Sequence, residues 1–273
     1  MKRPFATVIV NGLLIGLAFV SLFPLLWMLS VSFMSPGEAG SQPPPLLPGS
    51  PTLANYRELF VRGGMLRYFM NSLLLATTVT LVSLAFNAMA GYAFAKLQFS
   101  GQQRIFKALI ATLIIPGQVA MMPLFLLLKQ MGLVNTYGGV IVPAMAGIFG
   151  IFLVRQYALS IPDEMLEAAR LDGAGEFRIF ASIIVPLLAP ILASLAIFTF
   201  LGSWNDFMWP LIVLTDSKLH TLPVALASLS REHVQDSEMM MAGSVVTVLP
   251  VLVVFLLLQK YYIRGLLVGS VKG

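Results

Sequence analysis

The sequence predicts an all-α integral membrane protein with about six transmembrane helices and one short cytoplasmic helix between the fourth and fifth spans. Of its 273 residues, 58% are hydrophobic and only 11% are charged, whereas a soluble domain carries about 25% charged residues. Such a chain has too few polar side chains to cover a folded surface in water. Its apolar runs are also continuous, without the period-two alternation of a barrel strand, which favours helices.

Six apolar segments are candidates for membrane spans, because a helix needs about 20 apolar residues to cross the hydrocarbon core. Proline interrupts the third and fourth segments at Pro116, Pro123 and Pro143, and Pro186 and Pro190 predict a bend near the start of the long fifth segment. We treat the whole chain, 1–273, as one transmembrane domain with spans near 7–33, 71–94, 105–128, 140–157, 183–214 and 242–262.

The basic residues predict how the chain is oriented. The apolar run after Lys2 and Arg3 is too long for a signal-peptide core of about 7–15 residues and lacks an A-x-A site, so we expect a retained first span. With an even number of spans both termini share one side, and 11 of the 17 Lys and Arg residues fall on that side. The positive-inside rule therefore places both termini in the cytoplasm. The net charge of +5 is scattered between apolar runs, which favours this role over nucleic-acid binding.

The loops and the missing cysteines limit the chemistry. The first outer loop, 35–70, contains the proline-rich run 43–51, which predicts an exposed spacer rather than a folded domain; a ligand for a proline-binding module is the alternative. The absence of cysteine excludes disulfides, thiolate metal sites and thiol nucleophiles. His220 and His233 lack the spacing of metal ligands, so no metal site is expected.

The segment between the fourth and fifth spans reads as a short helix with signals at both ends. Ser160 is a candidate N-cap, and Asp163 stands three residues later, as in a capping box. Asp163 and Glu164 lie at the positive end of the helix dipole and Arg170 at its negative end. Gly173 can take the left-handed conformation that ends a helix.

This short helix is predicted to dock against another protein. Ala168 and Ala169 permit close approach to a second surface, and Glu167 can pair with a basic group there. The alternative is an amphipathic helix lying on the membrane, which would need a polar face rich in Lys and Arg. The polar face is instead mainly acidic, and anionic lipid would repel it.

The same residues match a known signature: E-A-A, three residues, G, nine residues, then I-x-L-P. The chain has Glu167-Ala168-Ala169 and Gly173 at the required spacing, followed by Ile183-Ile184-Val185-Pro186, in which valine replaces leucine. At these positions it resembles the membrane subunits of ABC importers.

Other stretches indicate which class of ABC importer the chain resembles. Asn55-Tyr56 with Leu59-Phe60 and the stretch 202–211 resemble the carbohydrate-uptake permeases, and 265–273 is similar to the tail of the smaller permease in maltose-type transporters. The resemblance implies a bacterial cytoplasmic (inner) membrane protein that imports a sugar or polyol. It also implies several partners: a second homologous permease, two ATPase subunits and an extracytoplasmic solute-binding protein.

The resemblance further implies roles for particular residues. The segment 160–186 would couple the chain to the ATPase through Glu167, Ala168, Ala169, Arg170, Asp172 and Gly173, and the tail would touch the ATPase through Gly265, Gly269 and Lys272. A P-loop needs a Gly-Lys pair, which the chain lacks. ATP and Mg²⁺ would therefore bind the partner ATPase, and this chain would be a transporter subunit without a cofactor of its own rather than an enzyme.

A polar group of residues is the candidate translocation path. Asp206 is the only acidic residue inside a predicted span. Asn205 adjoins it and Trp204 and Trp209 lie nearby in the sequence, so that these residues can line a sugar path. An outer aromatic belt with helix–helix hydrogen bonds explains them equally well. Asn87 and Gln118 are weaker candidates, for which helix–helix hydrogen bonding is the alternative.

A secondary transporter driven by an ion gradient is the competing function. Such proteins tend to carry several buried ionisable residues and inverted repeats, and the sequence offers one buried aspartate and no evident repeat. Membrane-enzyme motifs such as G-x-S-x-G and H-E-x-x-H are absent from the sequence.

Overall fold

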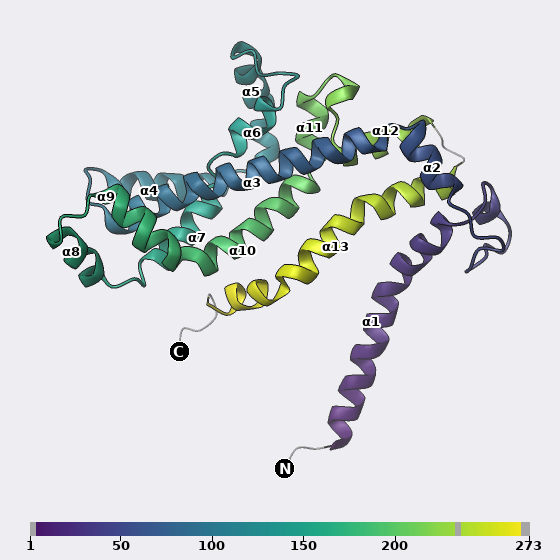
Figure 1. The fold of residues 1–273 in the computed structure, drawn as a ribbon, viewed down its shortest axis with the longest axis horizontal. Coiled ribbons are helices and arrows are strands. Elements are labelled where there is room, and N and C mark those ends of the chain that lie inside the picture. The colour runs from purple at the N-terminus through teal and green to yellow at the C-terminus, as the bar shows by residue number, and fades with distance from the viewer. Residues whose placement is uncertain (1–3, 233–235, 269–273) are drawn as a thin grey trace. The chain divides into compact units, whose positions relative to one another are not determined.

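The computed structural model describes residues 4–232 and 236–268, and within them the secondary structure is helical, without strands (Figure 1). Five helices are long and apolar enough to cross a membrane, and a bent pair raises the number to six within the same described residues. The chain divides into two compact units, Met1–Phe69 with Leu222–Pro250 and Met70–Thr221 with Val251–Gly273. Helices α3 (Met65–Lys96) and α13 (Ser237–Val268) each continue from one unit into the other.

The first unit begins with a helix that is suited to lipid. Its elements are α1 (Pro4–Ser32), the 3₁₀ turn η1 (Glu38–Gly40), α2 (Ala54–Val61), α12 (Leu222–Glu232) and the beginnings of α3 and α13. The candidate span Val8–Ser32 of α1 has a mean hydropathy of 2.3, and none of its tested 18-residue window is buried within the chain. A helix that is apolar all round and exposed is stable only in an apolar solvent, as in a membrane span.

The loop after α1 is folded over much of its length, which corrects the expectation of a plain spacer over 35–70. The buried Asn55 of α2 donates through Nδ2 to the carbonyl oxygens of Ser32 (3.0 Å) and Met34 (2.8 Å). The backbone N–H of Thr52 donates to the carbonyl of Phe33 at 2.8 Å. These bonds satisfy carbonyls at the end of α1, which a helix otherwise leaves unpaired.

The carboxylate of Glu38 links the start of this loop to its proline-rich part. The backbone N–H groups of Ser35 (2.9 Å) and Gly49 (2.6 Å) donate to its two carboxylate oxygens. These bonds favour the ionised form and lower the pKa of Glu38 below its ordinary value of 4.5, with the Gly49 bond as the larger cause.

The loop is therefore expected to loosen in acid. Because the folded-state pKa of Glu38 is depressed, its contribution to stability is present above the unfolded pKa of 4.5 and is lost as the pH falls through the lower folded value. Hydrogen-exchange protection over 35–49, corrected for intrinsic exchange rates, should fall in that range. Glu38→Gln should show weak protection at every pH, and a pH response in Glu38→Gln equal to that of the natural chain would refute the assignment.

The second unit is a bundle with two apolar clusters. In chain order it contains α3 from Met70, α4 (Gln102–Thr112), α5 (Gly117–Gln130), α6 (Gly138–Ala144), α7 (Ile148–Ala158), α8 (Asp163–Leu171), α9 (Glu176–Ile179), the π-helical turn η2 (Phe180–Ile184), α10 (Val185–Trp204), α11 (Met208–Val213), the 3₁₀ turn η3 (Ser217–Leu219) and the end of α13. One cluster joins α3, α7, α8 and α10, and includes Tyr92, Val154, Leu166 and Leu188. The other joins α3, α5, α6 and α11 around Leu75, Leu128, Val140 and Trp209.

Prolines break two of the predicted spans. Helices α4 and α5 pass the span criteria only as a pair and meet at 106°. Pro116 occupies the N-cap of α5 in an extended conformation; proline cannot donate to the preceding turn, and it biases the residue before it away from the helical region. The predicted third span, 105–128, is thus a pair of helices with a sharp bend between them rather than one straight helix.

The predicted span 183–214 also differs from the structure. Helix α10 ends at Trp204 and α11 begins at Met208, since Pro210 cannot donate to the carbonyl of Asp206. Asp206 therefore lies at a helix break and not inside a continuous span. At the other end a π-helical turn, η2, precedes Pro186, where the sequence predicts a bend.

Candidate functional site

Helix α8 is anchored on one side by a leucine. Leu166 is 1% exposed and packs in the cluster that holds Ile161, Ile179 and Ile184. The predicted capping box does not form, because Pro162 occupies the N-cap and the Ser160 hydroxyl donates to the carbonyl of Tyr157 at 2.7 Å. Apolar packing, rather than a polar N-cap, therefore holds the start of α8.

The end of α8 has the termination geometry that the sequence predicts. Gly173 has φ of +81°, a left-handed conformation that residues with a Cβ rarely adopt. The N–H of Gly173 donates to the carbonyl of Arg170 (3.0 Å) and the N–H of Ala174 donates to that of Ala169 (2.9 Å). This pair of bonds is a Schellman motif, which satisfies the last carbonyls and stops the helix before α9.

A lysine ties the start of α8 to the end of α3. The Lys96 ammonium donates to the Asp163 carboxylate (2.6 Å) and to the carbonyl of Ile161 (2.5 Å). The Lys96 side chain is only 5% exposed, whereas that of Asp163 is 73% exposed. Because the lysine is nearly enclosed, this pair fixes the position of α8 against α3 better than an ion pair in open solvent would.

A second set of hydrogen bonds between side chains links α8 to α9 and α3. Glu176 accepts from the Tyr92 hydroxyl and from Arg170 Nε, each at 2.7 Å. The hydrogen bond that Arg170 donates to Glu176 raises the pKa of the Arg170 guanidinium. Arg170, which the family resemblance assigns to the ATPase contact, thus has a partner within its own chain, and its guanidinium holds the α8–α9 turn.

The outward side of α8 is exposed and partly apolar. Glu167, Ala168 and Asp172 are exposed, and Ala169 is half-buried. Two large apolar side chains of α8 and α9 are exposed as well: Leu171 is 89% exposed and Phe177 is 80% exposed. Sequence reasoning missed both, although an apolar residue at each end of a short polar turn is a readable signal of a contact surface.

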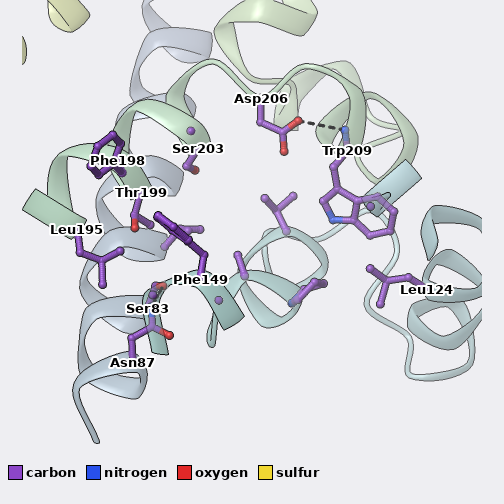
Figure 2. Close-up of a pocket in the computed structure, with 18 of the residues that line it drawn as sticks. Ser83, Asn87, Leu124, Phe149, Leu195, Phe198, Thr199, Ser203, Asp206 and Trp209 are labelled. Atoms are coloured by element: carbon purple, nitrogen blue, oxygen red, sulfur yellow. Dashed lines mark hydrogen bonds between the residues drawn. The ribbon is translucent and has the colours of Figure 1, made fainter. Parts of the chain in front are cut away.

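A cavity of about 510 Å³ lies among α3, α5, α6, α7, α10 and α11 (Figure 2). Its wall is mostly apolar, with aromatic side chains from Phe149, Phe198 and Trp209. The polar side chains that line it are Ser83, Asn87, Thr199, Ser203 and Asp206. A largely apolar hollow with a few placed polar groups is the usual form of a small-molecule site.

Asn87 is the most constrained polar group of the cavity. It is fully buried, and its Nδ2 donates to the Ser83 hydroxyl at 2.9 Å. Its Oδ1 is buried without a hydrogen-bond partner within the described chain, which costs about 1–3 kcal/mol. A Cβ on Gly150 would collide with the Asn87 amide, so the glycine makes room for it.

The break between α10 and α11 forms the opposite wall. Asp206 Oδ1 accepts from the backbone N–H of Trp209 at 3.3 Å, the bond drawn in Figure 2. The Trp209 indole in turn donates through Nε1 to the carbonyl of Gly139 at 3.1 Å. Together these bonds hold the carboxylate and the indole on the wall of the cavity.

The structure brings together three of the six predicted path residues. Asn87, Asp206 and Trp209 line the cavity, whereas Trp204, Asn205 and Gln118 are not among its lining residues. Trp204 is buried and stacks on a phenylalanine ring, with 5.8 Å between the ring centroids. Asn205 and Gln118 are exposed, and Asn205 bonds back to the carbonyl of Leu201.

Comparison with known proteins decides the family. A sequence model of the "binding-protein-dependent transport system inner membrane component" matches residues 88–268, well over half of the chain. The chain belongs to this family. The matched stretch contains α8 and all of the cavity lining except Val79, Ser83 and Asn87.

Curated relatives of this inner-membrane component are permeases. The chain is 39% identical, over all of both chains, to the arabinooligosaccharides transport system permease protein AraQ of Halalkalibacterium halodurans. It is 30% identical to the lactose transport system permease protein LacG of Rhizobium radiobacter, over 100% of this chain and 98% of that one. The chain is a permease subunit, as these relatives are.

A solved structure has the same fold. One chain of a bacterial ABC transporter that imports the acidic polysaccharide alginate matches with a TM-score of 0.85 at 23% identity, over 96% of this permease and 98% of that chain.

The predicted tail site is only partly described, since Gly265 lies near the end of α13 while Gly269 and Lys272 lie outside the described residues.

Proposed function

We propose that the chain is one permease subunit of a binding-protein-dependent, ATP-driven importer of a sugar or polyol. It forms the translocation path with a second homologous permease and is driven by two separate ATPase subunits, which bind ATP and Mg²⁺. The observation that carries the proposal is α8: a short helix held firmly to the bundle on one side and exposed on the other.

The attachments of α8 suit it to transmit force. Leu166 is embedded among residues of α7, α9 and α10, and Lys96 links Asp163 to the end of α3. A push on the exposed side of α8 is therefore carried directly to two membrane-length helices. Glu167, Ala168 and Asp172 form the exposed contact surface, with Leu171 and Phe177 as its apolar part.

A protein cleft is a better partner for this surface than a lipid surface. Two of its exposed residues, Glu167 and Asp172, are acidic, and Glu164 is a further exposed acidic residue of α8. The cytoplasmic leaflet is negative and attracts basic rather than acidic segments. A protein cleft with an apolar floor and a basic rim suits this surface. The floor would bury the exposed leucine and phenylalanine, and the rim would pair with the carboxylates.

The orientation follows from the excess of basic residues. Both termini and α8 lie on the cytoplasmic side of the inner membrane, next to the ATPase, and the loop 35–70 lies outside, next to the solute-binding protein. The tail with Gly265, Gly269 and Lys272 is proposed as a second ATPase contact.

The cavity supports a sugar or polyol as the solute. Amide, hydroxyl and carboxylate groups form hydrogen bonds with sugar hydroxyls, and the faces of Phe149, Phe198 and Trp209 suit the apolar faces of sugar rings. AraQ and LacG are named for arabinooligosaccharide and lactose transport, respectively. Asn87 and Asp206 are proposed to line the path, whereas Trp204, Asn205 and Gln118 are proposed to support it from outside the cavity.

Uptake by reconstituted vesicles tests the proposal. The chain, purified with its companion subunits, should accumulate solute only when ATP is supplied on the α8 side and the binding protein on the other side. An imposed proton or sodium gradient without ATP should drive no uptake. Uphill accumulation driven by such a gradient, with no ATPase attached, would establish the secondary transporter instead.

A further inference from the structure

We infer that the cavity selects an electrically neutral, polyhydroxylated solute and rejects phosphorylated and carboxylated ones. The inference rests on the proposed transport function and adds a charge requirement to it. It comes from the hydrogen-bonding character of the wall groups and from the charges on the wall.

One wall group requires hydrogen-bond donors from a solute. Asp206 carries a carboxylate with acceptor oxygens only, and one of them accepts from Trp209 N at 3.3 Å. Asn87 does not offer a second such group, because it is 0% exposed and its Nδ2 donates to Ser83, so its unpartnered Oδ1 is closed to a solute. A sugar hydroxyl can donate to the Asp206 carboxylate, whereas a phosphate dianion or a carboxylate group can only accept.

The wall supplies no cationic side chain for an anion. None of the residues lining the cavity, all of which belong to the described part of the chain, is Lys, Arg or His. Proteins that recognise phosphate or carboxylate in a largely apolar site use guanidinium or ammonium groups, because an unpaired ion is costly to remove from water. Asp206 adds a like charge, which raises that cost further.

The helix ends at the cavity do not reverse this conclusion. Gly117 and Gly147, at the amino termini of α5 and α7, line the cavity. Each terminus favours an anion with about half a positive charge. Asp206 opposes both termini from the same wall, so no net positive charge remains for a solute anion.

Because the chain contains no cysteine, charge selectivity can be measured at one introduced thiol. Ser203→Cys places a thiol on the cavity wall, three residues before Asp206 in the sequence. In the assembled complex, this subunit is modified with an anionic methanethiosulfonate and, for comparison, with neutral methyl methanethiosulfonate. The ratio of the two rates reports the charge preference of the cavity independently of the solute.

The expected result is a low anionic-to-neutral ratio for Ser203→Cys, at least three-fold below that of Ser100→Cys in the exposed turn between α3 and α4. Adding Asp206→Asn should raise the ratio at least three-fold, and adding Asp206→Glu should leave it within two-fold. Equal ratios for the cavity and exposed thiols, unchanged by Asp206→Asn, would overturn the inference.

Transport assays distinguish a failure of the neutral-solute inference from a failure of the proposed importer function. ATP-dependent uptake of glycerol 3-phosphate or of a uronate oligosaccharide by the complex would overturn the neutral-solute inference and leave the importer function standing. ATP-dependent uptake of a neutral oligosaccharide that excess glycerol 3-phosphate does not inhibit would support both.

Discussion

Replacing Glu167 with lysine is expected to reduce ATP-driven uptake at least about ten-fold while the chain still folds. Glu167 lies on the exposed side of α8 and has no ion-pair partner among the described residues, so the change breaks no ion pair there. At the proposed ATPase cleft it places a cation against basic groups, and such like-charge contacts cost several kcal/mol; each 1.4 kcal/mol is a factor of ten.

The measurement is uptake into vesicles together with the amount of ATPase that co-purifies. Glu167→Gln, which removes the charge without reversing it, should have a smaller effect. Glu58→Lys is the matched charge reversal on α2, where the natural carboxylate pairs with Arg62 at 2.9 Å, and it should leave ATPase assembly unchanged. Full uptake and normal assembly with Glu167→Lys would mean that α8 does not dock through this face.

Replacing Leu166 with alanine is expected to destabilise the end of the bundle that holds α8 by about 2–5 kcal/mol, the usual cost of truncating a buried leucine. Leu166 is 1% exposed and packs with Ile179 and Ile184, so the truncation leaves a cavity beneath α8. Uptake should fall together with stability, because a loosened α8 no longer moves the helices to which it is attached.

Leu171→Ala is the matched control on the same helix. Leu171 is 89% exposed, so this substitution should change the stability of the purified subunit in detergent by less than about 0.5 kcal/mol, while it weakens assembly with the ATPase. Thermal unfolding and co-purification of both variants check the contrast. If the two substitutions destabilise the subunit equally, Leu166 does not anchor α8.

Much of the architecture was predictable because its signals are local. Long apolar runs identify membrane-spanning helices by length alone, and five or six such helices are found in the described residues. The end of α8 at Gly173 was also predictable. A left-handed glycine that ends a helix acts only on residues close to it in the sequence. The start of α8 was not: Pro162 took the N-cap and Ser160 bonded back to the preceding helix.

The sequence by itself determined the membrane class, the helical content and the position of the short helix with its acidic, small-residue face. These properties depend on composition and on residues within a turn or two of one another. Only the tertiary structure decided which polar residues share a cavity. Asn87 and Asp206 line it while Trp204 and Asn205 do not, because the break before Pro210 and the space at Gly150 set where each side chain lies. Contacts between residues far apart in the chain follow from how helices pack, and packing depends on side-chain shape at many positions at once.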